Sequence, residues 1–349
     1  MSQVQYLEVD ADGEDQRLDR WFRRIFPHIP QGRIEKMCRK GEIRVDGGRV
    51  KTSTRLVEGQ KVRIPPLPTA DETQRKRAEH NAVSDAGSAM IRSCVIYKDD
   101  DIIVLNKPAG LPVQGGSGQT RHIDGLAEAL KFGNDTKPKL VHRLDKDTSG
   151  VLLLARNGRA AKGLAKAFQD KTTQKIYWAL VAGHPEQNIG TIRFGLVKQS
   201  GHGPNNAGEK MVCIPPNLID ETPGAKRATT DFVVIESVGK RATWVGLAPI
   251  TGRTHQLRAH MAEIGCPIAG DGKYGGSSQV NEGEGWGAQL GGAISRKMHL
   301  HARSITLKHP ITGKEMFFEA PLPDHMQRTW EFFGWDLKWA PKNPFGMYE

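Results

Sequence analysis

The chain has 349 residues, 38% of them apolar, which is enough for one large domain and a smaller one with ordinary buried cores. Its 50 lysines and arginines outnumber its 39 acidic residues, and the net charge of +11 favours a polyanionic partner. The four cysteines form no C-x-x-C pair, which argues against a zinc site and a disulfide framework. A polar, acidic N-terminus without a long apolar run argues against a secretory signal or a membrane span. We therefore expect a soluble, cytoplasmic protein.

Much of the positive charge lies near the start of the chain. Residues 17–63 hold 14 lysines and arginines against five acidic residues. Apolar residues follow helical spacing from Leu18 to Ile25 and again from Ile34 to Cys38. Asp46-Gly47 is a tight-turn dipeptide between two short strands. The sequence predicts a compact helix-helix-strand domain over residues 1–65.

A change of composition separates this domain from the rest of the chain. Residues 66–90 are rich in proline, polar and charged residues with little to bury, which predicts a flexible linker. Residues 91–325 are expected to form the main domain. Residues 326–349, with several aromatic side chains, are expected to form a C-terminal tail.

The main domain is predicted to be α+β with a mainly antiparallel, mixed sheet. Helical spacing occurs at 161–168 and 257–264. Two polar segments rich in glycine or proline, 199–227 and 270–297, are expected to be long surface loops. Short β-rich runs separated by turn residues predict strands at 94–100, 101–108, 150–155, 175–183, 230–238, 242–249 and 299–310.

One polar turn carries the most specific motif, HRLDKDTSG at residues 142–150. An aspartate in a turn usually caps or orients the chain. This nine-residue string, however, matches the signature of the RluA family of pseudouridine synthases, in which the first aspartate is the essential carboxylate. The resemblance implies that Asp145 is the catalytic carboxylate. Asp147 is then expected to be structural and to hydrogen-bond the turn that presents Asp145.

Three further motifs resemble those of the same family: NKPAG at 106–110, KIYWALVAG at 175–183 and TGRTHQLR at 251–258. The resemblance implies that Tyr177 lies against the target uracil. It also implies that Leu257 packs on the base and that Arg258 pairs with Asp145. No cofactor is implied.

Two regions bear on the target RNA. Residues 17–63 resemble the alpha-L RNA-binding motif of ribosomal proteins and of many of these synthases. Residues 111–118, LPVQGGSG, resemble the RluC branch more than the RluD branch, although Gln114 stands where relatives carry histidine. The resemblance implies that the RNA partner is 23S ribosomal RNA, with RluC-type sites favoured. RluD-type sites and transfer RNA are the alternative targets.

The chemistry of pseudouridine formation suits these residues. The bond from C1′ to N1 breaks, the base turns, and C1′ joins C5, which needs no redox step. A carboxylate can attack C1′ or remove the C2′ proton, and the sequence leaves both routes open. Arg258 would favour the ionised form of Asp145, and the ring of Tyr177 can stack on a flipped base. Arg143 is expected to face the same side as Asp145 and to contact the RNA backbone.

Other classes of protein fit less well. A hydrolytic glycosidase would need a second acid in a comparable motif. The histidine spacings do not match a zinc pattern, so we expect no metal site. A non-catalytic RNA-binding protein is the alternative from another class, but the intact aspartate, tyrosine and arginine favour an enzyme. We expect a monomer.

Overall fold

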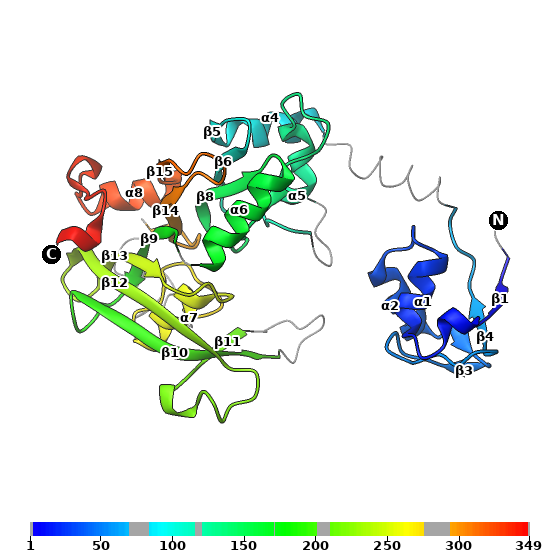
Figure 1. Cartoon of the computed structure of the whole chain (residues 1–349). Coiled ribbons are helices and arrows are strands. Elements are labelled where there is room, and N and C mark those ends of the chain that lie inside the picture. Colours follow the sequence, from blue (N-terminus) through cyan, green and yellow to red (C-terminus); the bar gives the residue numbers. More distant parts are fainter. Residues whose placement is uncertain are drawn as a thin grey trace. The chain divides into compact units, whose positions relative to one another are not determined.

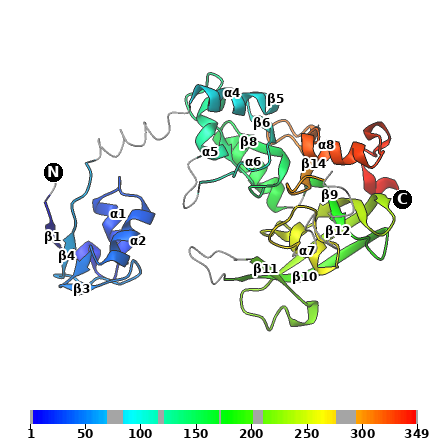
Figure 2. The ribbon, with the colours of Figure 1, turned by 180° about the vertical axis from the view of Figure 1, so that it is seen from behind.

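The computed structural model describes residues 3–69, 84–115, 121–170, 172–200, 210–275 and 294–347. The chain forms two compact units, Met1–Ala82 and Val83–Glu349, which are described separately (Figure 1 and, from behind, Figure 2). Across the described ranges, no helix is long and apolar enough to cross a membrane.

The N-terminal unit packs two helices against a four-stranded antiparallel sheet with the order β1-β4-β2-β3. Both predicted helices and the predicted turn are confirmed. Gly41 ends α2 with a φ of 70°, and Asp46 and Gly47 join β2 to β3 with positive φ. Strand β1 was not predicted. The elements are β1 (Gln5–Glu8), η1 (Ala11–Gly13), α1 (Leu18–Ile25), α2 (Gln31–Lys40), β2 (Arg44–Val45), β3 (Gly48–Arg49) and β4 (Lys61–Ile64).

The C-terminal unit is built on one sheet with the order β11-β10-β12-β13-β9-β14-β8-β6-β5; β15 also pairs with β14, and β7 with β8. Among the described strands, β14 and β8 form the single parallel pair. The predicted α+β fold with a mainly antiparallel sheet is therefore confirmed. The strands are β5 (Val95–Lys98), β6 (Ile102–Lys107), β7 (Lys139–Leu140), β8 (Ser149–Ala155), β9 (Gln174–Ala182), β10 (Ile189–Gln199), β11 (Lys210–Ile214), β12 (Lys226–Val238), β13 (Ala242–Pro249), β14 (Leu300–Lys308) and β15 (Glu315–Glu319).

Helices pack around this sheet, and α8 with two short helices follows the last strand at the C-terminal end of the chain (Figure 1). Helix α4 begins at Asp85, inside the range predicted to be linker, and residues 70–83 of that range lie outside the described residues. The expected C-terminal tail is partly core, because Trp330 of α8 stacks on Trp178 of β9 with ring centroids 5.4 Å apart. The helices are α4 (Asp85–Ser93), α5 (Ile123–Leu126), η2 (Ala127–Leu130), α6 (Gly158–Gln169), η4 (Pro216–Leu218), α7 (Gln256–Glu263), α8 (Asp324–Phe332), η7 (Leu337–Trp339) and η8 (Pro344–Met347).

The seven predicted strands of the main domain are confirmed, but β7, β10, β11 and β15 were missed. Gly190 and Gly195 interrupt the apolar pattern of β10. A side chain at Gly190 would come within 2.8 Å of Phe232, and one at Gly195 within 2.7 Å of Ile219, so close packing explains both glycines. The loop predicted at 199–227 is wrong at residues 210–214, which form β11, while residues 201–209 lie outside the described residues.

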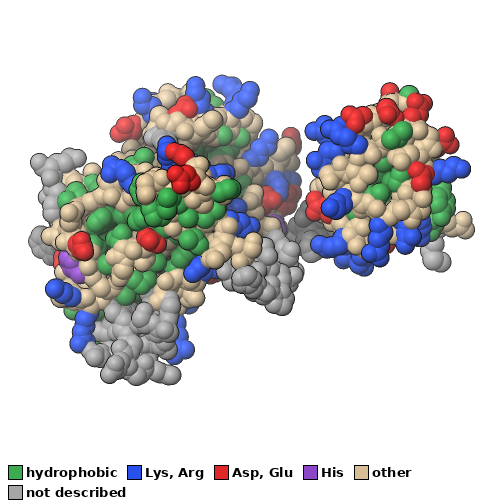
Figure 3. All heavy atoms as spheres, turned by 90° about the horizontal axis from the view of Figure 1, so that it is seen from below, with side chains coloured by type: hydrophobic (Ala, Val, Ile, Leu, Met, Phe, Trp, Pro, Cys, Tyr) green, Lys and Arg blue, Asp and Glu red, His purple; other side chains and the backbone are tan. Residues whose placement is uncertain are grey.

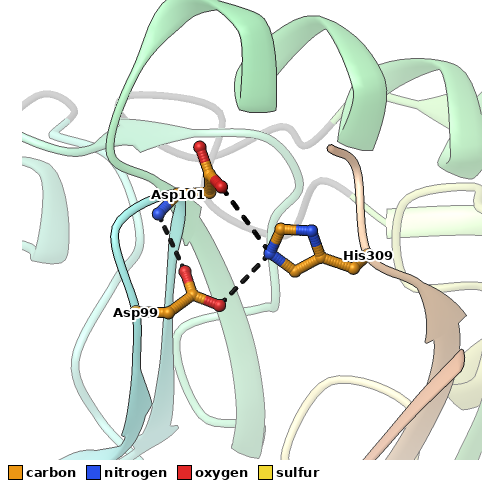
Figure 4. Close-up of side chains that lie close together, drawn as sticks. All are labelled: Asp99, Asp101 and His309. Atoms are coloured by element: carbon orange, nitrogen blue, oxygen red, sulfur yellow. Dashed lines mark hydrogen bonds and ion pairs between the residues drawn. The ribbon is translucent and has the colours of Figure 1, made fainter. Parts of the chain in front are cut away.

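A cluster of Asp99, Asp101 and His309 ties the end of β14 to the turn between β5 and β6 (Figure 4). Nδ1 of His309 accepts the backbone N–H groups of Ile311 and Thr312, so the ring proton lies on Nε2. Nε2 is 3.2 Å from Oδ2 of Asp99 and can donate to it. Because a protonated nitrogen has no lone pair for a metal, this geometry suits a structural hydrogen bond better than a cation site.

Candidate active site

A pocket of about 520 Å³ opens where three parts of the C-terminal unit meet. One wall is the turn before β8, which carries Arg143 and Asp145. A second wall comes from β9, through Lys175 and Tyr177, and a third is residues 249–258, the end of β13 and the start of α7. This volume lies within the range of about 300–1,000 Å³ that small-molecule sites occupy.

Buried Lys107, at the end of β6, holds the turn that carries Asp145. Its Nζ donates hydrogen bonds to the carbonyl oxygens of Pro108, Leu111 and Lys146 at 2.8–2.9 Å, which uses all three N–H groups of an ammonium. The N–H of Gly110 also donates to the carbonyl of Lys146. These bonds hold the backbone beside Asp145 in one position.

The backbone at Gly150 shows why the HRLDKDTSG string ends in glycine. Its φ is 108°, and an added Cβ would lie 2.2 Å from the carbonyl oxygen of Ala302. Only glycine fits this close approach of β8 to β14. The turn is thereby joined tightly to the sheet.

Arg258 on α7 is held between two carboxylates. Its Nε and Nη2 donate to the two oxygens of Asp271 at 2.6 and 2.8 Å, and its Nη1 lies 3.4 Å from Oδ2 of Asp145. The side chain of Asp271 is fully buried, and Arg258 is also covered by the ring of Tyr274 at 5.1 Å. This two-pronged pair fixes the guanidinium so that one N–H group faces Asp145.

Tyr177 and Leu257 both line the pocket, on β9 and α7 respectively. Burial raises the pKa of Tyr177 above its ordinary value, and nearby Asp145 raises that pKa further. Within the described part of the chain, the hydroxyl of Tyr177 has no hydrogen-bond partner, so its ring and hydroxyl are available to a bound group. The structure therefore brings Asp145, Tyr177, Leu257 and Arg258 together in one pocket, as the sequence predicted.

The family model for RNA pseudouridylate synthase matches residues 101–263. The ribosomal large subunit pseudouridine synthases C of Vibrio cholerae and Rickettsia bellii are 35% and 37% identical to this chain; they align with 94% and 90% of it and with 96% of their own lengths. The chain belongs to the RNA pseudouridylate synthase family.

The fold agrees with this membership. Human RNA pseudouridylate synthase domain containing 4 is a solved structure with 28% identity and a TM-score of 0.58, and the match covers 74% of this chain and 98% of that one. The protein is an RNA pseudouridine synthase, an isomerase, and the predicted RluA-type catalytic domain and enzyme class are confirmed.

Arg143 and Asp147, the other two charged residues of the signature considered above, are placed differently. Arg143 lines the pocket on the same side as Asp145, as predicted, and its side chain is exposed. Asp147 is also exposed and makes no hydrogen bond or ion pair with any described residue. The prediction that Asp147 hydrogen-bonds the turn is therefore wrong; Lys107 and the N–H of Thr148, which donates to the carbonyl of Asp145, hold the turn instead.

The sequence did not reveal which residues hold Arg258 in place. Residues 270–297 were predicted to be a surface loop, yet Asp271 is buried and Tyr274 half-buried in the synthase site. The prediction failed because a glycine-rich, polar segment resembles a loop whether its aspartate faces water or an arginine. Residues 276–293 lie outside the described residues. The NKPAG motif indicated a turn, but it did not indicate that Lys107 is buried and donates three hydrogen bonds to backbone carbonyls.

Proposed function

We propose that this pseudouridine synthase modifies uridines of large-subunit ribosomal RNA, with RluC-type sites favoured, and that Asp145 is its catalytic carboxylate. The target rests on relatives from Vibrio cholerae, Rickettsia bellii and Yersinia pestis, all named ribosomal large subunit pseudouridine synthase C. Gln114 stands where the family resemblance implies a histidine, and residues 116–118 of the same segment lie outside the described residues.

One observation carries the catalytic assignment. Asp145 lies in the pocket with Oδ2 facing the guanidinium of Arg258, while the ring of Tyr177 lines the same pocket. A target nucleotide flipped from the RNA could stack its uracil on Tyr177 and Leu257, and such stacking contributes about 1–3 kcal/mol for each base. The sugar would then face the carboxylate of Asp145, which can attack C1′ or remove the C2′ proton.

The neighbouring acids favour isomerisation over hydrolysis. A hydrolytic glycosidase places two carboxyl groups on either side of the scissile bond. Here Asp147 is exposed and does not line the pocket, and both oxygens of Asp271 accept hydrogen bonds from Arg258. Asp145 is thus the single carboxylate among the described lining residues.

We propose that residues 1–65 form an alpha-L RNA-binding domain. Arg20 and Arg23 of α1 and Arg33, Lys36 and Arg39 of α2 are exposed and have no ion-pair partner within the described residues. Figure 3 shows many Lys and Arg side chains on the surface of this unit, chiefly along its left and lower edges. Free exposed cations suit phosphate contacts, which give affinity without reading sequence. Exposed Arg143 is proposed to contact RNA beside the pocket.

The target can be tested by mapping pseudouridines chemically in ribosomal and transfer RNA from cells with and without the gene. We expect specific sites in 23S ribosomal RNA to lose pseudouridine and to regain it when the wild-type gene is restored. Loss at RluD-type sites or only in transfer RNA would replace the proposed target. An unchanged pattern in both RNAs would refute it.

A further inference from the structure

His255 is a second group close to the catalytic carboxylate. It precedes α7, lines the pocket, and places Nε2 3.8 Å from Oδ2 of Asp145. Its backbone is left-handed, with a φ of 52° and a ψ of 20°, a conformation that costs a histidine free energy. Such strain persists only where surrounding contacts require it, and it concentrates at functional sites.

Tyr274 determines which ring nitrogen of His255 carries the proton. The hydroxyl oxygen of Tyr274 accepts the backbone N–H of Met211 at 2.8 Å and lies 3.0 Å from Nδ1 of His255. Among the described residues, Nδ1 is the only acceptor available to the hydroxyl proton. The hydroxyl therefore donates to Nδ1, and in the neutral ring the proton lies on Nε2, the nitrogen that faces Asp145.

Burial is the main cause that keeps the ring of His255 neutral. Burial lowers the pKa of His255, and Arg258 and Lys273 lower it further, against the opposing effects of Asp145 and Asp271. A neutral ring with its proton on Nε2 is a hydrogen-bond donor to a carboxylate without adding a second positive charge.

We propose that His255 is a positioning residue for Asp145 and that Tyr274 fixes its donor tautomer. This inference rests on the proposed catalytic role of Asp145. The distance of 3.8 Å is longer than a hydrogen bond, and such contacts often shorten when substrate binds. His255 and Arg258 then hold the same oxygen, Oδ2, from two directions.

The arrangement assigns different roles to the two carboxylate oxygens. Oδ2 faces both donors, whereas Oδ1 has no hydrogen-bond partner in the described part of the chain. Fixing Oδ2 from two directions prevents rotation of the carboxylate, so that Oδ1 is presented to the substrate. Oδ1 is the oxygen that would attack C1′ or take the C2′ proton.

Three variants separate this role from that of the strained backbone. His255→Asn tolerates the left-handed conformation but is too short to reach Asp145. His255→Gln keeps an N–H group at similar reach, and Tyr274→Phe removes the hydroxyl but keeps the ring over Arg258. We would measure kcat, KM and Tm of the full chain with a transcript of large-subunit ribosomal RNA, including the His255→Asn, Tyr274→Phe double variant.

We expect His255→Asn to lower kcat about 10- to 100-fold, the effect of one hydrogen bond to a charged group, with KM unchanged. His255→Gln should restore most of kcat. Tyr274→Phe should lower kcat less, and should add nothing in the His255→Asn background, because it acts through the ring. Nitrogen NMR of the histidine ring should show the proton on Nε2 in the wild type.

Wild-type kcat in His255→Asn would overturn the proposal, as would a Tyr274→Phe effect that multiplies fully in the double variant. If His255→Asn melts early, His255→Gly, which relieves the backbone, takes its place and the same two outcomes apply. Asp145→Asn is assayed alongside. Activity in Asp145→Asn would refute the proposed function itself, whereas an inactive Asp145→Asn with a fully active His255→Asn would refute this inference alone.

Discussion

The two units use their charges in opposite ways. In the N-terminal unit, basic side chains such as Arg33, Lys36 and Arg39 are exposed and lack acidic partners among the described residues. In the C-terminal unit, Arg258 is buried and bound by Asp271, and Lys107 gives all its N–H groups to carbonyls. An exposed cation can move to meet a phosphate, whereas a buried one has a single fixed position. If the N-terminal unit binds RNA as proposed, affinity for RNA and chemistry on the uridine are expected to be separable.

The most severe test of this separation is Asp271→Asn, which removes the anchor of Arg258. Breaking one partner from a buried ion pair costs about 3–5 kcal/mol of unfolding free energy. A misplaced guanidinium should lower the single-turnover rate about 100-fold, while RNA affinity stays near the wild-type value. Urea unfolding, single-turnover kinetics and RNA titration measure the three quantities.

Asp147→Asn is the matched control for that variant, because Asp147 is exposed and makes no hydrogen bond or ion pair with any described residue. Its rate and its unfolding free energy should stay within about 0.5 kcal/mol of the wild type. Equal losses in both variants would show that any lost charge near the turn matters, and that Asp271 has no special role.

Acid should separate the units by stability. Burial lowers the pKa of His301 to about 3 and that of His260 to about 4, below the ordinary value of about 6.5. Between pH 6.5 and these values the unfolded chain binds protons that the folded chain does not, so the unfolding free energy falls as pH falls. From pH 6.5 to 5 the loss is about 2 kcal/mol for each histidine.

Hydrogen exchange at pH 6.5 and 5, corrected for intrinsic rates, locates that loss. Both histidines lie in the C-terminal unit, and the described residues of the N-terminal unit include no fully buried histidine. Peptides of β12, β14 and α7 should lose protection, whereas peptides of α1 and α2 should keep it. An equal loss in the two units would contradict this assignment.

The smallest expected effect is on affinity. The triple variant Arg33→Gln, Lys36→Gln, Arg39→Gln should make the negative slope of log affinity against log salt shallower by about 2. Three phosphate contacts to single-stranded RNA are then lost. kcat should not change. The matched control is Arg55→Gln, since exposed Arg55 is already paired with Asp15 at 2.7 Å. A triple variant with an unaltered salt slope would show that the N-terminal unit does not bind the RNA backbone.

The sequence predicted this molecule best where a pattern is local. The spacing from Leu18 to Ile25 predicted α1, and the apolar run at 150–155 predicted β8, because burial periodicity depends on near neighbours. The HRLDKDTSG string led to Asp145 because nine specified residues are far rarer than one aspartate in a turn.

It failed where a residue's role depends on a partner distant in the chain. The buried carboxylate of Asp271 is paired with Arg258 and accepts two backbone N–H groups, and the glycines of β10 are needed because Phe232 and Ile219 cover them. The sequence also did not predict that Lys107 donates hydrogen bonds to three backbone carbonyl oxygens. Composition does not encode such contacts, whereas the folded sheet creates them.

Asp145→Asn tests whether Asp145 is the catalytic carboxylate and whether RNA binds without its charge. The purified variant would be incubated with an unmodified transcript of 23S ribosomal RNA, with pseudouridine mapped chemically and RNA affinity measured in the same buffer. We predict near-complete loss of pseudouridine formation with affinity and Tm close to the wild type. Pseudouridine formed at the wild-type rate would show that Asp145 is not the catalytic carboxylate.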